Sequence, residues 1–566
     1  MPTPRPVLSS AKRIALCTLA SRITGLLRDI LLARTFALSW VQDAFSYAFA
    51  LPNLFRRLFG EGGLAPVFIP TFTQTLERDG PDAAWRLLAR TFALLTVALV
   101  AVTLLIEGVV LAAWLLAPPM TPEQLAERSL LLGLTALMMP FMISICLLAL
   151  FAAILNVVGS FVPGALAPVV LNICMIAALA GVGVALGGTP PEQQVWWVAL
   201  SVLIAGVLQL LTLRPALRAH GVRVAWQLDT ADPTVRRMLR LLPPVALGQG
   251  VLAFGVFLDA QICILLTRTA GAPPTIGWLG GVAYPLSEGA LSALTYAQRL
   301  YQFPLGVLVI SLATAALPAF SRLAAQRDWA AWTNEVRALT RMALFESVLA
   351  GAMMIALAEP IVRLLFEYGE FDAADTTRTA GVLAWYGVGL WAFSAQHIVL
   401  RGFYSLHDAA TPLRISCAVL PLNLALSVVL VWLPAIRESA FAISSAATYG
   451  VAVIVGVLVL QRRQGATTVD RSARIINGEF AIAVAKMLLA AAAAGAVVAM
   501  LTPVWHAVES VSALPEILRR GLATASGLGT GAAVYVLVAA LLRLPEAGAL
   551  LARARRRLRG PRRDSR

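Results

Sequence analysis

The sequence is poor in charge, and the charges that it has are mostly of one sign. Only 13% of its 566 residues are charged and 59% are hydrophobic, with 45 basic against 30 acidic residues. Soluble domains carry about 25% charged residues, so this composition excludes an ordinary soluble protein. A lipid bilayer is the solvent that suits such a chain, and we expect a membrane protein.

Cysteine and histidine are also scarce, and their placement excludes further classes of protein. The five cysteines lie in apolar runs without paired spacing and the four histidines are scattered, so neither disulfides nor a metal centre is expected. A net charge of +15 raises the question of nucleic acid, but the basic residues lack interleaved aromatics. We expect no nucleic-acid partner and attribute the charge to orientation in the membrane and to contact with anionic lipid.

Long apolar runs are what the sequence has in abundance. A run of about 20 residues is long enough to cross roughly 30 Å of hydrocarbon as a helix. Counting the runs and the proline- and glycine-rich breaks between them predicts an all-α, multi-pass fold with about fourteen transmembrane helices. The expected spans are residues 10–35, 42–75, 84–117, 129–156, 163–187, 195–217, 240–267, 290–321, 334–358, 376–406, 412–433, 439–461, 480–502 and 517–543. The first run carries charges where a signal peptide has an uncharged core, so we expect it to be retained.

The connections between spans alternate between basic and acidic. Arginines cluster after spans six, eight and twelve, whereas the segment 359–375 after span nine is acidic. By the positive-inside rule the basic segments are cytoplasmic, and an even number of spans places both termini in the cytoplasm. We therefore expect an inner-membrane protein with residues 223–235 inside and 359–375 outside. The longest external segment, 268–289, is rich in proline and glycine and is expected to be a flexible insert.

Span one contains charges that a lipid-facing helix would not tolerate. A centrally placed arginine costs about 2.5–3.5 kcal/mol in a membrane, so Arg22 and Arg28 must face water, a counter-charge or a ligand. Helical geometry places them about 120° apart with Gly25 midway, which makes a cationic face with a bare centre. The bare centre leaves room for another helix or for a bulky ligand. The alternative is that Arg22 pairs with Asp29 or another internal acid and only locks the bundle.

Span two adds two arginines beside an expected break in the helix. Pro52 removes a backbone donor and glycines follow position 59, so we expect a kinked or broken helix next to Arg56 and Arg57. Arg57 and Glu61 stand four residues apart and can pair, which leaves Arg56 available for an anion. Asp43 and Glu61 either support an anion-binding cavity or act only as counter-charges.

Span eight contributes another arginine at depth. Arg299 lies about nine residues, or roughly 13 Å, into the apolar run, with Gln302 one turn later and no acid close in sequence. A cavity that receives an anion explains such an arginine better than a local salt bridge does. The planar guanidinium donates two hydrogen bonds at once and stays charged, which suits phosphate.

At these residues the sequence resembles the MurJ (MviN) family of lipid II flippases, within a superfamily of multidrug and polysaccharide exporters. The matching stretches follow the family's order along nearly the whole chain; they are Ser21 to Asp29, Ala33-Arg34, Asp43 to Phe45, Leu51 to Arg57, Phe59, Glu61-Gly62, Tyr296-Ala297, Arg299-Leu300, Phe303-Pro304, Gly306-Val307, Gly402 to Ser405, Asp408 and Thr411-Pro412. The resemblance implies two six-helix lobes around a central cavity lined by spans one, two, seven and eight, plus two C-terminal helices that form a lipid-tail groove. The implied ranges are 1–220, 221–465 and 466–545, followed by a basic cytoplasmic tail, 546–566.

The resemblance also implies an activity. A lipid II flippase moves the undecaprenyl-pyrophosphate-linked peptidoglycan precursor from the cytoplasmic to the periplasmic leaflet, so we expect alternating access and no enzyme chemistry. The implied partners are lipid II, the bilayer and the cell-wall synthesis machinery. In the family, the arginines that match Arg22, Arg28, Arg56 and Arg299 handle the pyrophosphate and sugars, and the acids that match Asp43 and Glu61 are functionally sensitive. Many members carry Glu where this chain has Gln302, which leaves one acid fewer to pair with Arg299.

The energy source and two rival functions stay open at this point. No cofactor is expected, and the drive is either the membrane potential or a monovalent cation. The resemblance implies a cation site in some members among spans seven, eleven and twelve, where Asp259, Asn423 and Ser427 could supply oxygens. Asp259 is either such a ligand or a neutral, hydrogen-bonded carboxyl group. The rivals are a flippase or exporter of another polyprenyl-linked saccharide, and a drug/cation antiporter, which would favour an acidic, aromatic-lined pocket over an arginine cluster.

Overall fold

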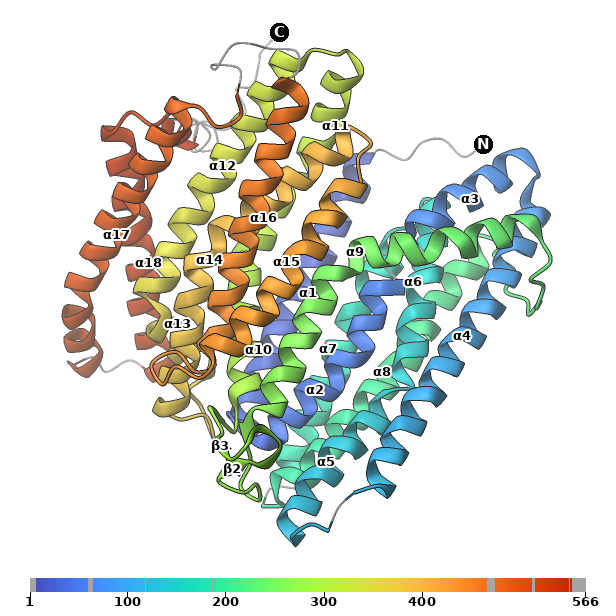
Figure 1. The fold of residues 1–566 in the computed structure, drawn as a ribbon, viewed down its shortest axis with the longest axis horizontal. Helices are drawn as coiled ribbons and strands as arrows, with labels where there is room; N and C mark the ends of the chain where they lie inside the picture. Colours follow the sequence, from blue (N-terminus) through green and yellow to red (C-terminus); the bar gives the residue numbers. More distant parts are fainter. Residues whose placement is uncertain are drawn as a thin grey trace. The chain divides into compact units, whose positions relative to one another are not determined.

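The computed structural model shows an all-α architecture (Figure 1), which confirms the predicted fold class. It describes residues 7–59, 65–117, 119–185, 188–465, 474–511, 515–548 and 550–551. The earlier α-helices are α1 (Val7–Phe36), α2 (Trp40–Phe55), α3 (Ala65–Arg78), α4 (Pro81–Leu115), α5 (Pro122–Met138), α6 (Phe141–Val157), α7 (Val162–Ala185), α8 (Pro191–Ala219) and α9 (Pro233–Leu265). The later ones are α10 (Ala290–Pro304), α11 (Ile310–Ala325), α12 (Trp329–Ala356), α13 (Ala358–Phe366), α14 (Ala373–Ser405), α15 (Ala410–Leu430), α16 (Ser439–Gly465), α17 (Gly478–Val511) and α18 (Glu516–Leu541).

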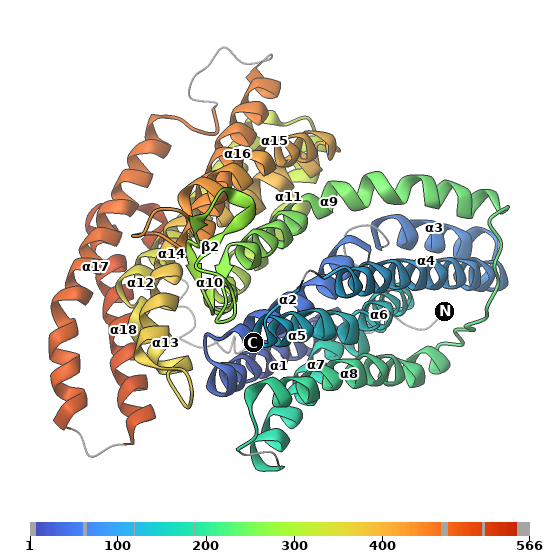
Figure 2. The same ribbon diagram turned by 60° about the horizontal axis from the view of Figure 1, so that its bottom comes forward.

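The chain divides into two compact units. The first comprises residues 1–292 and 368–372, and the second comprises residues 293–367 and 373–566, so the boundary lies inside α10. Helix α9, which the sequence assigned to the second lobe, packs against α2 and α3 and belongs to the first unit. In the second unit, α17 and α18 pack side by side (Figures 1 and 2). The ranges 1–220, 221–465 and 466–545 stay a prediction, and most of the tail 546–566 lies outside the described residues.

The predicted spans all fall on helices, but only some of those helices are apolar throughout. Nine helical segments of the described ranges are long and apolar enough to cross a membrane; they are α4, α5 with α6, α7, α8, α12, α15, α16, α17 and α18. The other predicted spans fall on α1, α2 with α3, α9, α10 with α11, and α14. Four of these are the spans that the family resemblance assigned to a cavity lining. A helix that faces a polar cavity need not be apolar on every side.

Two arginine-bearing helices are interrupted beside prolines. α2 ends at Phe55, shortly after Pro52, and residues 56–59 continue as a π-helical turn, so the helix changes its winding beside Arg56 while the predicted kink or break stays a prediction. α10 ends at Pro304 and continues into a second π-helical turn, η3 (Leu305–Val309), before α11. π-helical turns are rare and are frequently found at functional sites.

Each unit has an apolar core of its own and an apolar exterior. Phe68 and Phe141 are fully buried in the first unit, and Trp332 is fully buried in the second. On α4 the side chains of Leu104 and Leu105 are 66% and 68% exposed. Such exposure would be a liability in water, but hydrocarbon chains are as apolar as leucine, so these surfaces are suited to lipid.

The segment 268–289, expected to be flexible, has a defined fold. β1 (Thr267–Arg268) pairs in parallel with β4 (Leu286–Ser287), β2 (Thr275–Ile276) pairs antiparallel with β3 (Val282–Ala283), and the 3-10 turn η2 (Gly277–Leu279) lies between β2 and β3. The backbone N–H of Gly271 donates to Glu127 Oε1 at 3.1 Å, and a Cβ on Gly271 would lie 2.8 Å from the backbone N of Gln124. Glycine therefore allows the insert to lie against the start of α5.

Contacts in the first unit place several predicted external connections at one end. Trp40 Nε1 donates to the carbonyl oxygen of Glu127 at 3.3 Å. The backbone N–H of Glu370 donates to the carbonyl oxygen of Arg34 at 3.0 Å. With the insert against α5, these contacts join the connections after spans one, three, seven and nine. If successive spans cross the membrane in opposite directions, the connections after all odd-numbered spans must lie at the same end, as these four do. Which end of the protein faces the outside of the cell stays a prediction.

Candidate functional site

Helix α1 carries a buried ion pair that is tied to α7. Arg28, 6% exposed, donates from Nε and Nη2 to Asp29 Oδ1 at 2.9 and 2.7 Å. Its Nη1 donates to Asn172 Oδ1 at 3.0 Å, and Asn172 Nδ2 donates to Ser21 O and Thr24 Oγ1, both at 3.1 Å. Asn172 therefore fixes the orientation of the guanidinium and joins α7 to α1. The network compensates a cation that would be costly inside a membrane.

Gly25 lies on the face of α1 that packs against α7. A Cβ on Gly25 would lie 3.4 Å from Asn172 Nδ2, so another helix occupies the bare centre of the predicted cationic face. Asp29 forms an ion pair with the adjacent Arg28, and the alternative that Arg22 pairs with Asp29 or another internal acid stays open. Arg22 itself is half-buried on the same helix.

The arginines of span two lie in the π-helical turn that follows α2. Arg56 is half-buried and its Nε donates to Asn53 Oδ1 at 3.4 Å, whereas Arg57 is exposed. Glu61 lies outside the described residues, so the predicted Arg57–Glu61 pair stays a prediction. Because a π-helical turn changes the angle between successive side chains, these two arginines point differently from residues on a regular helix.

Asp43 of α2 is fully buried and holds the first turn of α10. Its Oδ2 accepts the N–H of Gly289 at 2.8 Å, and its Oδ1 accepts the N–H and the hydroxyl of Ser292 at 2.7 and 2.5 Å. Gly289 has a φ of 82°, and a Cβ there would lie 2.4 Å from Leu38. A carboxylate at a helix N-terminus satisfies otherwise free N–H groups and interacts favourably with the helix dipole. This cap is a role for Asp43 that the sequence did not indicate.

Arg299 lies on α10 within the second unit, away from the face of α10 that packs on α14. Tyr301, two residues later, stacks on Tyr386 and Phe393 of α14 with ring centroids 4.7 and 5.1 Å apart. Two residues correspond to about 200° around a helix, so Arg299 is on the opposite face, and its side chain is exposed. Gln302 is half-buried one turn further on. Since Arg22, Arg28 and Arg56 belong to the first unit, the convergence of all four arginines stays a prediction.

The three residues of the suggested cation site are buried but lie in different units. Asp259 is 8% exposed on α9 of the first unit, whereas Asn423 and Ser427 lie on α15 of the second. Asn423 Oδ1 accepts the hydroxyl of Thr448 at 3.3 Å, and the hydroxyl oxygens of Ser427 and Ser444 are 2.6 Å apart. Both α15 side chains thus bond to α16, and their use as cation ligands together with Asp259 stays a prediction.

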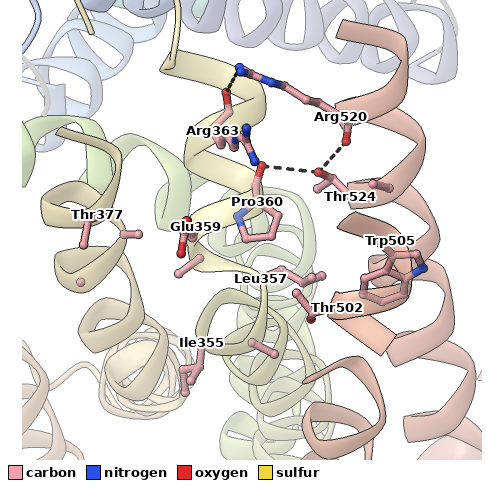
Figure 3. Close-up of a pocket in the computed structure, with 15 residues that line it drawn as sticks. Ile355, Leu357, Glu359, Pro360, Arg363, Thr377, Thr502, Trp505, Arg520 and Thr524 are labelled. Carbon is pink, nitrogen blue, oxygen red and sulfur yellow. Dashed lines mark hydrogen bonds between the residues drawn. The ribbon is translucent and has the colours of Figure 1, made fainter. Parts of the chain in front are cut away.

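A charged cluster that the sequence analysis did not single out joins α13 to α18. Arg520, 9% exposed, donates to the backbone carbonyls of Arg363 and Glu367 at 3.3 and 3.1 Å. It also donates to the carboxylates of Glu367 and Glu516 at 3.2 and 2.6 Å. Beside this cluster lies a cavity of about 380 Å³ between α12–α14 and α17–α18 (Figure 3). In the sequence, only the i, i+4 spacing of Glu516 and Arg520 could have indicated part of this cluster, since residues four apart on a helix can form an ion pair.

Nine helical segments of the described ranges are long and apolar enough to cross a membrane, and they define a multi-pass membrane protein. Comparison with known proteins then identifies the family. The family model of the lipid II flippase MurJ matches residues 32–518. The chain belongs to this family, as the sequence motifs predicted.

Curated relatives cover most of the chain. The probable lipid II flippase MurJ of Rhizobium tropici is 32% identical over 432 residues, which are 76% of this chain and 76% of the relative. The lipid II flippase MurJ of Burkholderia cenocepacia is 32% identical over 413 residues, covering 71% and 74%. The probable lipid II flippase MurJ of Vibrio cholerae is 30% identical over 467 residues, covering 80% and 83%.

Solved structures share the fold at lower identity. The lipid II flippase MurJ in an inward closed conformation has a TM-score of 0.67 at 20% identity and covers 94% of this chain and 98% of its own. An inward-facing multidrug transporter of the MATE family, in the MOP superfamily, has a TM-score of 0.63 at 15% identity and covers 79% and 95%. These likenesses place the fold among multi-pass transporters.

Proposed function

We propose that this protein flips lipid II from the cytoplasmic to the outer leaflet of the inner membrane. The observation that carries the proposal is the set of arginines inside the helices of a chain that belongs to the MurJ family. A pyrophosphate cannot enter hydrocarbon without compensation, and guanidinium groups supply it by charge and by paired hydrogen bonds. Transport of this kind breaks no bond, so the protein acts as a transporter and not as an enzyme.

The arginines have different parts in the proposed binding step. Arg28 is already held by Asp29 and Asn172, so its proposed part is to hold α1 against α7 beside the binding arginines. Arg22 and Arg56 are half-buried and Arg299 is exposed, and these three side chains are proposed to bind the pyrophosphate. Arg57 and Gln302 flank them and support the cavity, as does Glu61.

The proposed movement is alternating access around the head group, with the isoprenoid tail in lipid. The boundary between the two compact units falls inside α10, directly after Ser292. The Asp43 cap holds the part of α10 that belongs to the first unit, while Arg299 lies beyond the boundary. The π-helical turns after α2 and α10 supply the local irregularity that a moving helix needs. We assign the tail groove to residues 466–545.

The proposed drive is the membrane potential, which supplies about 2.3 kcal/mol per charge per 100 mV. A monovalent cation at Asp259, Asn423 and Ser427 is the second possible source, and no other cofactor is required. Both termini are proposed to be cytoplasmic, and the cell-wall synthesis machinery is the proposed partner that consumes the flipped precursor.

Complementation tests the function directly. A strain depleted of its own lipid II flippase should grow when it expresses this chain, and lipid II should become accessible to an externally added probe. Growth without external lipid II would contradict the proposal. Restored export of another polyprenyl-linked saccharide, or of drug cations, would favour the corresponding rival; the MATE likeness supports only the shared fold.

A further inference from the structure

The cavity of the second unit lies where several helices end. Its lining comes from the end of α12, the start of α13 and α14, the end of α17 and the first turns of α18 (Figure 3). Ends of membrane-crossing helices lie at the depth of the lipid head groups. A volume of about 380 Å³ is within the range of ligand pockets. The cavity is therefore large enough, and at the right depth, for a lipid head group.

The polar lining presents both signs of charge. Arg520 is occupied by Glu367 and Glu516, whereas Glu359 forms no hydrogen bond or ion pair within the described part of the chain. Arg363, one helical turn after Glu359, lines the same cavity with a side chain that is 36% exposed. A guanidinium has five N–H donors and can serve the carboxylate of Glu367 and a phosphate oxygen together.

The rest of the lining is apolar. Ile355 is 47% exposed beside Leu357, and Trp505 forms the wall on α17 (Figure 3). Tryptophan is favoured where the membrane meets water because its ring has an apolar body and a polar N–H. An occupant with a charged end and an apolar end fits this lining better than a free ion does.

We propose that the cavity binds a resident bilayer phospholipid whose head group carries a phosphate and a primary ammonium. Glu359 accepts the ammonium, Arg363 donates to the phosphate, and the first part of the acyl chains lies along Ile355 and Trp505. The two charged residues are four positions apart, about 6 Å along the helix, which matches a head group with both charges. The occupant of this site is not lipid II but a lipid of the surrounding leaflet, so the site goes beyond the proposed flipping. The leaflet is the outer one if the segment 359–375 faces the outside, as predicted.

Native mass spectrometry of the purified full-length protein tests the site. Phosphatidylethanolamine, phosphatidylcholine and phosphatidylglycerol with identical chains are offered in equal amounts. The wild type should retain phosphatidylethanolamine best, because phosphatidylcholine has no ammonium N–H and phosphatidylglycerol has no cation. Glu359→Gln should reduce the preference over phosphatidylglycerol about threefold, the size expected for one exposed ion pair. Glu359→Lys should retain phosphatidylglycerol best, and Ile355→Ser should weaken the binding of all three lipids to the same extent.

Glu192→Gln is the matched control. Glu192 is also an exposed acid at the second position of a helix, α8, but it is outside the cavity, so its variant should keep the wild-type preference. An unchanged preference in Glu359→Gln, or an equal loss in Glu192→Gln, would overturn the proposal. So would tighter binding of phosphatidylglycerol to the wild type. Displacement of phosphatidylethanolamine by lipid II would place the cavity on the transport path and would also refute a resident lipid.

Discussion

The carboxylate of Asp43 accepts both the N–H and the hydroxyl of Ser292, at 2.7 and 2.5 Å, although 249 positions separate the two residues. The contact fixes the first turn of α10 on α2 immediately before the chain enters its second unit. Because Asp43 is fully buried, its charge is compensated by these donors and by the N–H of Gly289. The acid is thus a structural clamp at the point where the two units are joined by the chain.

Replacing Asp43 with Asn should lower the free energy of unfolding by about 2–3 kcal/mol, because charge-assisted hydrogen bonds are lost in a buried place. Ser292→Ala should lower the free energy of unfolding by less than Asp43→Asn does. Because the two residues share a hydrogen bond, the double variant should lose about 1 kcal/mol less than the sum of the losses in the two single variants. Thermal unfolding in detergent measures all three. Asp82→Asn, an exposed acid in the first turn of α4, is the control and should be neutral. Strict additivity would refute the clamp.

Alanine at Arg22, Arg56 or Arg299 should abolish complementation while normal amounts of protein remain in the membrane. Removing a cation from an apolar helix relieves an insertion cost, so folding should not suffer. Lysine should rescue only in part, because a point charge cannot grip phosphate with two parallel hydrogen bonds. Immunoblots of membranes together with growth assays decide it. Full growth of all three alanine variants would contradict the proposed binding step.

Arg28→Ala should behave differently and reduce the amount of protein. The change leaves Asp29 buried without the ion pair that the structure shows, and it breaks the bond to Asn172. Breaking a buried pair by removing one partner costs about 3–5 kcal/mol. Arg28→Ala with Asp29→Asn should therefore recover membrane levels relative to Arg28→Ala alone. Equal abundance of the Arg28 and Arg22 alanine variants would argue against the network.

Gly25 should tolerate alanine but not leucine. A Cβ at this position would lie 3.4 Å from Asn172 Nδ2, which is an ordinary van der Waals distance. A larger side chain would push α7 away from α1. We expect Gly25→Ala to keep wild-type thermal stability and Gly25→Leu to lose it. Gly108 of α4 is the control, because no neighbouring side chain or helix of the described residues lies within 4 Å of a Cβ at this position, so leucine there should be harmless. Harmless leucine at position 25 would contradict the close approach.

Cysteine placed at Asp372 should react with an impermeant reagent in intact cells, and cysteine at Thr230 should not. Both positions are exposed, so reactivity reports the side of the membrane. The prediction follows from the acidic and basic connections that contain them. The native cysteines are replaced beforehand, and permeabilised cells show that position 230 can react. The reverse pattern would invert the topology.

The sequence alone determined the solvent, the class of fold and the family. Apolar runs place the spans because hydrocarbon admits only a satisfied backbone, so a helix of fixed length is the local solution. Pro52 likewise indicated an irregular helix beside Arg56, where the structure has a π-helical turn, because proline acts on its own helix. These are properties of neighbouring residues, and they can be found without knowing what packs against what.

Tertiary structure alone decided the partners of the buried charges. Arg28 meets Asn172 across 144 positions, and Asp43 caps a helix that begins far along the chain. Asp43 stands in the first turn of its own helix, so local reasoning offered it a role there or as a counter-charge. A buried polar group takes whichever partner the packed helices bring within about 3 Å, and neither sequence spacing nor residue type specifies which helix that is.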